Sequence, residues 1–323
     1  MKNRFSVLAT LRKVALATAT VLAFLSVTGC DNDDDATPKA ITDIVVEDAN
    51  FSILEAAVIR AGLGDALRSG TLTVFAPTDA AFRAYGVADA AAVAALPVDA
   101  VRGILQYHVL NSRVAAADIP ANASNTATRT LSNQDVYITK TGTNVFVNGA
   151  QVTQADIQAS NGVIHVINQV LAPPPAAQNG NILGVIASLP NMTLVTAAIA
   201  RVAAVPANAA LATALTTQQF TVFAPNDAAF QAAGYANASA ISTAPIDALQ
   251  RILLNHVVPG RIYSNNLSTG NVTSAGNGTL AVTVGGSGVT VKSNGIPTAA
   301  NVTRANQTGT NGVVHVIDRV LVP

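Results

Sequence analysis

Hydrophobic positions change their spacing along the chain, and each spacing predicts an element. Ile41–Ala61 carries apolar side chains that settle into helical spacing, with Asn50 or Ser52 as the expected cap. Thr71–Ala76 alternates and is rich in β-formers, so it predicts a strand. Pro97–Leu110 returns to helical spacing. This part of the chain is therefore expected to fold as helix, strand and helix.

Short β-rich runs follow, broken by Gly and Asn. They cover residues 136–139, 144–147, 151–155 and 162–171. Asn148-Gly149 is a favoured hairpin dipeptide. Because helices come first and strands later, we predict the α+β class with an antiparallel sheet system.

The pattern occurs twice. Thr73–Phe82 (TVFAPTDAAF) returns 148 positions later as Thr221–Phe230 (TVFAPNDAAF). Two further blocks stay in step: Tyr107-His108-Val109 with Asn255-His256-Val257, and NGVIHVIN from Asn161 with NGVVHVID from Asn311. A repeat of this length is a duplicated domain rather than a solenoid.

The repeat divides the chain into five segments. Residues 1–29 are expected to be a signal peptide, 30–39 an acidic tether, 40–173 a first copy, 174–180 a Pro-rich linker and 181–323 a second copy. An extra stretch around residues 205–214 explains why the second copy is seven residues longer before its first strand.

These three ordered motifs resemble the signatures of the fasciclin domain, and the resemblance covers both copies. It implies a wedge of two mostly antiparallel β-sheets with packed α-helices, and an extracellular or periplasmic protein that works chiefly in adhesion. The resemblance also makes Tyr107 and His108 candidate binding residues, with Asn255 and His256 as their counterparts. Asn255 departs from the Tyr of the first copy, which weakens a recognition role there.

The first thirty residues resemble a bacterial lipoprotein leader. A basic segment precedes the uncharged apolar run Val14–Val27, which is shorter than the roughly 20 residues of a membrane-spanning helix. The run ends in Val27-Thr28-Gly29-Cys30, which resembles a lipobox. The resemblance implies cleavage before Cys30 and a diacylglycerol on its thiol; the alternative is an ordinary secretory signal followed by a chance Cys.

Asp31-Asn32-Asp33-Asp34-Asp35 follows Cys30 directly and is expected to form a solvated tether. Such a stretch resembles a surface-export signal in some lineages, whereas an Asp after the lipidated Cys retains proteins at the inner membrane in others. The expected location is the cell envelope, at the outer membrane or cell surface, with the periplasmic face as the alternative.

Composition narrows the choice of partners. Only 11% of residues are charged, and removing the four leader cations from 18 basic residues leaves 14 against 18 acidic residues, a net charge of −4. Nucleic acid is therefore not an expected partner. The expected partners are the membrane, through the lipid anchor, and a surface protein or polysaccharide. The only Cys is Cys30, so an intramolecular disulfide is excluded.

The four histidines are the natural candidates for chemistry. His165 and His315 each occupy one position of an apolar strand without Asp, Glu or Cys at ligand spacing, so we expect packed residues and no metal site. For His108 and His256, the alternative to a binding role is the same: a histidine packed in the core. Asp79 and Asp227 follow a strand and a Pro, which favours a helix-capping role over an acid catalyst.

No catalytic residue or cofactor is predicted, because nucleophile-elbow, phosphate-loop and zinc spacings are absent from the sequence. The leading hypothesis is a membrane-anchored, non-catalytic module for adhesion or attachment to matrix polymers. A periplasmic carrier that holds a small apolar ligand between sheet and helices is the alternative. An enzyme using the histidine pairs is a third.

Overall fold

The computed structural model describes residues 38–121, 124–286 and 288–323. Cys30, the leader and most of the acidic tether lie outside these residues. Pro38–Pro323 forms one compact unit that contains both copies. Within it, no described helix combines the length and the apolar character needed to cross a bilayer.

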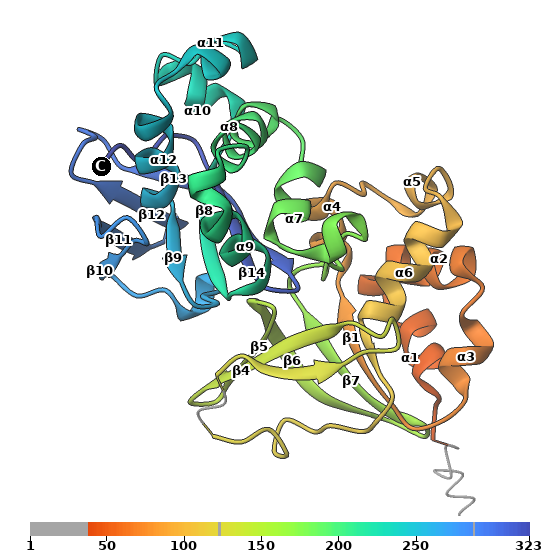
Figure 1. The fold of residues 1–323 in the computed structure, drawn as a ribbon. Coiled ribbons are helices and arrows are strands. Elements are labelled where there is room, and N and C mark those ends of the chain that lie inside the picture. Colours follow the sequence, from red (N-terminus) through yellow and green to blue (C-terminus); the bar gives the residue numbers. More distant parts are fainter. Residues whose placement is uncertain (1–37, 122–123, 287) are drawn as a thin grey trace, which may run out of the picture. The chain divides into compact units, whose positions relative to one another are not determined.

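The first copy begins with helices and ends with strands (Figure 1). Its helices are α1 (Ile41–Glu47), η1 (Ala49–Phe51), α2 (Ser52–Ala61), α3 (Gly64–Arg68), α4 (Asp79–Tyr85), α5 (Ala90–Ala94) and α6 (Val98–Tyr107). Its strands are β1 (Leu72–Pro77), β2 (Val109–Leu110), β3 (Thr126–Arg129), β4 (Asp135–Thr141), β5 (Asn144–Val147), β6 (Ala150–Ala159) and β7 (Gly162–Ile167).

The second copy repeats this order, and its α9 has nine residues where the equivalent α3 has five. Its helices are η2 (Ala177–Gly180), α7 (Ile182–Ser188), α8 (Thr193–Ala203), η3 (Pro206–Asn208), α9 (Ala209–Thr217), α10 (Asp227–Ala232), α11 (Ala238–Thr243), α12 (Ile246–Asn255) and η4 (Ser264–Asn266). Its strands are β8 (Phe220–Pro225), β9 (Val257–Pro259), β10 (Gly270–Thr273), β11 (Thr279–Gly285), β12 (Gly288–Ser293), β13 (Ala300–Gly309) and β14 (Gly312–Ile317).

Each copy contains one seven-stranded mixed sheet, which confirms the predicted α+β class. The strand orders are β2-β1-β7-β6-β5-β4-β3 and β10-β11-β12-β13-β14-β8-β9. Neighbouring strands are antiparallel except β1 with β7 and β8 with β14. Register shifts interrupt the long strands β6 and β13, and bulges of this kind bend a sheet. The resulting curvature accounts for the wedge.

The parallel pair lies at the centre of each copy. All six residues of β1, β7, β8 and β14 are buried, as expected for parallel strands covered on both faces. One core cluster packs between the helices and this pair, and a second fills the other side of the sheet. Phe75 and its counterpart Phe223 lie in the second kind of cluster, whereas Val74 and Val222 lie in the first. Strand alternation therefore builds both cores at once.

A glycine opens the last strand of each copy, because the neighbouring backbone approaches closely there. A Cβ on Gly312 would lie 2.0 Å from the carbonyl oxygen of Phe220, and one on Gly162 would lie 2.0 Å from that of Leu72. No side chain fits at this distance, so the parallel pairing requires glycine at both positions.

Residues of the two copies also contact each other within the compact unit. The guanidinium of Arg261 lies 3.8 Å from the centre of the Tyr137 ring, and the Tyr263 hydroxyl donates to Asn148 Oδ1 at 3.2 Å. Tyr263 and Arg261 are both buried. A cation over an aromatic face is favourable when it is removed from water.

We expect Gly312→Ala to lower the free energy of unfolding by about 1–3 kcal/mol, since the added methyl must displace backbone. Gly103→Ala is the matched control. Gly103 lies inside α6 with open space around its Cα, so alanine there should raise stability by about 1 kcal/mol. Denaturant unfolding measures both. Equal stabilities for wild type and Gly312→Ala would contradict the close approach.

Candidate functional site

His108 and His256 occupy equivalent, buried positions and use both ring nitrogens. The Nδ1 of His108 lies 2.8 Å from the carbonyl oxygen of Ile104, and its Nε2 accepts the Leu171 N–H at 2.9 Å. His256 makes the same bonds to Ile252 and Leu321, both at 2.8 Å. A carbonyl can only accept, so Nδ1 carries the hydrogen and the ring is neutral. Neither nitrogen is free to bind a metal or take a proton in this geometry.

Burial in apolar surroundings reinforces the neutral form. It lowers the pKa of His108 and of His256 to about 4, against partial opposition from the backbone carbonyl bond. His315 has its pKa lowered to about 4 for the same reason. These rings are therefore uncharged at neutral pH.

His165 and His315 tie the last strand to a loop. His165 Nε2 lies 2.8 Å from the Val114 carbonyl oxygen, and its Nδ1 accepts the Asp156 N–H at 3.2 Å. His315 makes the equivalent contacts with Ile262 and Asn306. The rings also stack on Phe75 and Phe223, with centroids 5.8 and 5.5 Å apart. Each of these histidines thus links three segments of its own copy.

Asp79 and Asp227 cap a helix other than their own. Asp79 Oδ1 accepts the Ile53 N–H at 2.9 Å and Oδ2 accepts the Ser52 hydroxyl at 2.6 Å, at the start of α2. Asp227 does the same for α8 through Leu194 and Thr193. The carboxylate is favoured there by the unpaired N–H groups and by the helix dipole.

This arrangement corrects the predicted cap of α2. Residue Phe51 stands at its N-cap without a side-chain hydrogen bond, and Asp48 caps the preceding turn η1 by accepting the Asn50 N–H. The prediction of Asn50 or Ser52 was wrong because the cap comes from a carboxylate 26 positions away. Thr78 caps α4, accepting the Ala81 N–H at 3.3 Å.

Tyr107 and Asn255 are equivalent residues at the ends of α6 and α12, and each donates a hydrogen bond to a backbone carbonyl. The Tyr107 hydroxyl donates to the Asp135 carbonyl and accepts from Asn148, both at 2.9 Å, and burial raises its pKa. Asn255 instead donates to the Leu321 carbonyl at 2.9 Å. Both side chains are buried, so no polar atom of either reaches the surface.

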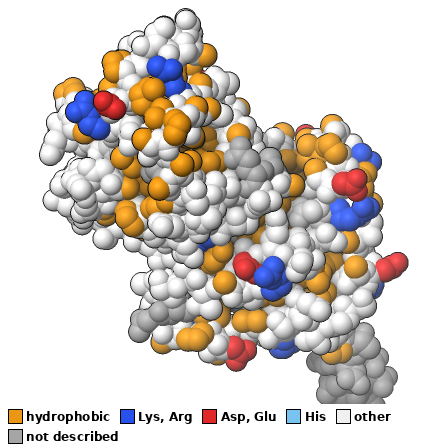
Figure 2. Space-filling model, in the orientation of Figure 1, with side chains coloured by type: hydrophobic (Ala, Val, Ile, Leu, Met, Phe, Trp, Pro, Cys, Tyr) orange, Lys and Arg blue, Asp and Glu red, His pale blue; other side chains and the backbone are white. Residues whose placement is uncertain are grey.

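The described part of the chain shows no group of three His, Cys, Asp or Glu side chains placed to hold a metal ion. Figure 2 shows a face with spread hydrophobic side chains and only scattered charges. Two cavities of the described chain are lined mainly by apolar side chains.

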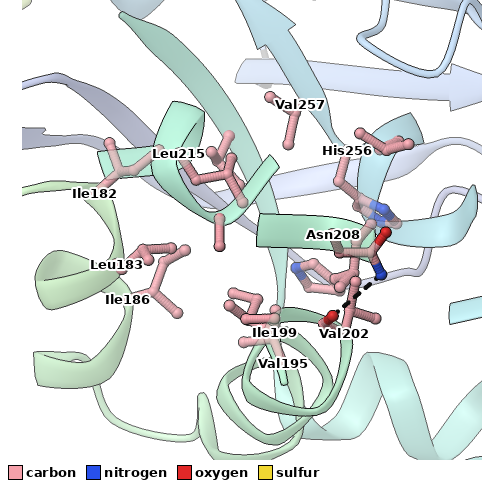
Figure 3. Close-up of a pocket in the computed structure, with 16 residues that line it drawn as sticks. Ile182, Leu183, Ile186, Val195, Ile199, Val202, Asn208, Leu215, His256 and Val257 are labelled. Atoms are coloured by element: carbon pink, nitrogen blue, oxygen red, sulfur yellow. Dashed lines mark hydrogen bonds between the residues drawn. The ribbon is translucent and has the colours of Figure 1, made fainter. Parts of the chain in front are cut away.

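One such cavity, here called the second pocket, lies in the second copy between α7, α8, α9, α12 and the sheet (Figure 3). Its volume, taken as the space open to the centre of a water-sized sphere, is about 60 Å³. His256 forms part of its wall, and Asn208 is tied to the Val202 carbonyl at 3.1 Å. Aliphatic side chains form nearly all the rest: Ile182, Leu183, Ile186, Val195, Ile199, Val202, Leu215, Val222, Leu253, Leu254 and Val257.

The first copy contains an equivalent cavity, the first pocket, with about 170 Å³ of the same kind of space. It is lined by Ile41, Thr42, Val45, Val46, Leu54, Glu55, Val58, Ile59, Leu67, Arg68, Val74, Leu105, His108 and Val109, among others. His108 and Val109 match His256 and Val257 of the second pocket. The candidate binding residues His108 and His256 therefore lie in pocket walls, with their ring nitrogens bonded elsewhere.

Thr42 has an unusual environment in the first pocket. Its side chain is only 7% exposed, and its hydroxyl has no hydrogen-bond partner among the described residues. A buried polar group without a partner costs about 1–3 kcal/mol. The equivalent position in the second copy is Leu183, which has no such group.

The carrier alternative expected a cleft between sheet and helices, but the sequence analysis did not identify the aliphatic residues that line the pockets. The sequence does contain a relevant pattern. When Ile41 is aligned with Ile182, apolar residues in the first two helices of one copy match apolar residues in the first two helices of the other. The same alignment sets Thr42 against Leu183. Nothing in the apolar pattern distinguishes a lined cavity from a filled core.

The comparisons with known proteins agree with the repeat. The model of the fasciclin domain matches residues 49–173 and 198–323. Protein sll1483 of Synechocystis is 40% identical over 144 residues, which are 43% of this chain and 77% of that protein. The pig transforming growth factor-beta-induced protein ig-h3 is 36% identical over 135 residues, 42% of this chain. This chain spans only 19% of the pig protein.

Among solved structures, a domain pair from the insect cell adhesion molecule fasciclin I is similar at 20% identity with a TM-score of 0.39. The similarity covers 87% of this chain and 96% of that one.

We expect the free energy of unfolding to fall as the pH drops from about 6.5 towards 4. Folded-state pKa values near 4 lie below the unfolded value of 6.5, so the unfolded chain binds more protons in this window. Each of His108, His256 and His315 contributes about 1.4 kcal/mol per pH unit there.

Denaturant unfolding at pH 7, 6 and 5 measures this slope. His108→Gln replaces one ring by an amide that does not titrate, so its slope should be shallower by one histidine's share. Stability independent of pH over this range would contradict the neutral, buried state.

Proposed function

The chain belongs to the fasciclin family, and from this premise we propose that it is a non-catalytic, membrane-anchored module that attaches cells to matrix or surface polymers. Fasciclin domains occur in adhesion-related extracellular proteins. The observation that carries the proposal is the duplication of such a domain behind a leader that ends in Cys30. The lipid anchor and the outward location are part of the proposal.

The histidine geometry supports a binding role over a catalytic one. All four rings have both nitrogens occupied by backbone groups, so none is poised as a base. The two aspartates cap helices. The motif residues that could have carried chemistry hold the fold instead.

The proposed attachment does not depend on strong charge. Only 11% of residues are charged, so contact with a polymer would rest on uncharged polar and apolar side chains. Such contacts are individually weak, and two copies on one anchor raise the overall avidity. Attachment should therefore depend little on salt concentration, because screening acts on charges.

A second candidate function is a carrier of a small apolar ligand, with the periplasmic face as its location. The equivalent cavities of both copies, with walls built from matching residues, favour it. Ligand sites are commonly concave, apolar and provided with few polar groups.

We expect a strain that lacks the protein to attach less to surfaces coated with polysaccharide or with matrix protein. Complementation with the wild-type chain should restore attachment, and Cys30→Ser should not, because the unanchored protein is released into the medium. Counting bound cells in 50 mM and 500 mM salt tests the expected weak salt dependence. Unchanged attachment in the deletion strain would overturn the proposal.

For the carrier role, native mass spectrometry of the purified protein should detect a bound small molecule. Xenon, which enters dry apolar cavities, should shift NMR signals of Val74 and Val222, one in each pocket. A clean apo mass together with no xenon response would exclude the carrier and leave the attachment proposal untouched.

A further inference from the structure

We propose that the first pocket is a binding site for a neutral single-chain amphiphile, an aliphatic chain that ends in a hydroxyl. The second pocket, in this proposal, is too small for such a chain. The inference rests on the carrier role and assigns it to one copy and one ligand class. Three observations carry it: the size and apolar rim of the first pocket, an unsatisfied hydroxyl and the charge beside the pocket.

The exposed rim of the pocket is more apolar in the first copy. Val46 and Ile59 line the first pocket with 57% and 71% of their surface exposed, and they are among the few large hydrophobic residues that stand exposed in the described chain. Exposed apolar side chains at a cavity mark a surface that receives something apolar. At the equivalent positions the second copy has the small residues Ala187 and Ala200.

The nine-residue helix α9 narrows the second pocket. It packs against α7 and α8 and contributes Ala212 and Leu215 to the wall. The first copy has the five-residue helix α3 in this place, and its pocket holds about 170 Å³ against about 60 Å³. At about 10–15 Å³ for each water, the first pocket has room for roughly ten waters and the second for about four. The first pocket can therefore hold a short aliphatic chain.

The Thr42 hydroxyl defines the polar end of the ligand. It is buried in the wall of the first pocket and has no partner among the described residues, so a ligand hydroxyl could satisfy it as donor or acceptor. The lining around it is otherwise apolar, apart from Glu55, Arg68 and the ring of His108. One hydrogen-bonding group on an apolar ligand matches this wall.

Charge beside the pocket favours a neutral head over an anionic one. Arg68 pairs with Asp43 at 2.5 Å, which neutralises its charge, whereas Glu55 has no ion-pair partner in the described part of the chain. The second copy has the uncharged residues Thr196 and Thr216 at the equivalent positions. The remaining negative charge of Glu55 would repel a fatty-acid carboxylate, so an alcohol is expected to bind better.

The probes are 1-octanol, octanoate and xenon, titrated into the purified protein at pH 7 and followed by NMR. We expect octanol to shift signals of Val45, Leu54 and Val74, and to bind at least fivefold more tightly than octanoate. Thr42→Val keeps the shape but removes the hydroxyl, so it should weaken octanol about fivefold, leave xenon binding unchanged and raise the melting temperature of the free protein. Thr42→Ser should retain octanol binding.

Leu183→Thr places a hydroxyl in the second pocket and is the matched control, which should create no octanol site because the volume of about 60 Å³ is too small for the chain. Equal binding of octanol and octanoate, unchanged octanol affinity in Thr42→Val, or octanol in the second pocket would each overturn the proposal. Xenon binding without an octanol response would also overturn it while sparing the carrier role. No response to either probe would remove both.

Discussion

Each copy depends on the parallel pairing of its first strand with its last. This pairing joins segments about 90 residues apart and brings the three repeated motifs together. In the first copy, Phe75 pairs with His165 across the strands, and its N–H donates to the His108 carbonyl at 2.9 Å. Gly162 permits the close approach that starts the pairing. Asn161, just before it, accepts the N–H of Ile41 and donates to the Leu67 carbonyl, so the same turn also fixes the first helices.

The pockets follow from this constraint. The helices that precede the first strand pack into the core and are also held at their ends by an Asn and by the carboxylate of Asp79 or Asp227. A space between these helices and the central strands is left in both copies. In the second copy the longer helix α9 lies against this space, so duplication produced a larger and a smaller version of the same pocket. The histidines belong to the frame of that site, because protonation of a ring would break a backbone bond in the core.

The local pattern predicted the order of helices and strands, and the repeat predicted two equivalent copies. Strand Thr71–Ala76 differs from the observed Leu72–Pro77 by one residue at each end. The pairing of β1 with β7 was not predictable from periodicity, because a period reports which face is buried and not which strand lies beside it. The α2 cap and the Thr42 environment were missed for a related reason: both depend on residues brought together by the fold. Cys30 and the tether lie outside the described residues, so the anchor remains a prediction from the leader.

Hydrogen–deuterium exchange of backbone amides in the purified protein tests the central pairing most directly. The account predicts the slowest exchange in β1 with β7 and in β8 with β14, because all residues of these strands are buried. Slowest exchange in the outer strands β3 and β10, with the central strands opening early, would contradict the claim that the parallel pair holds each copy together.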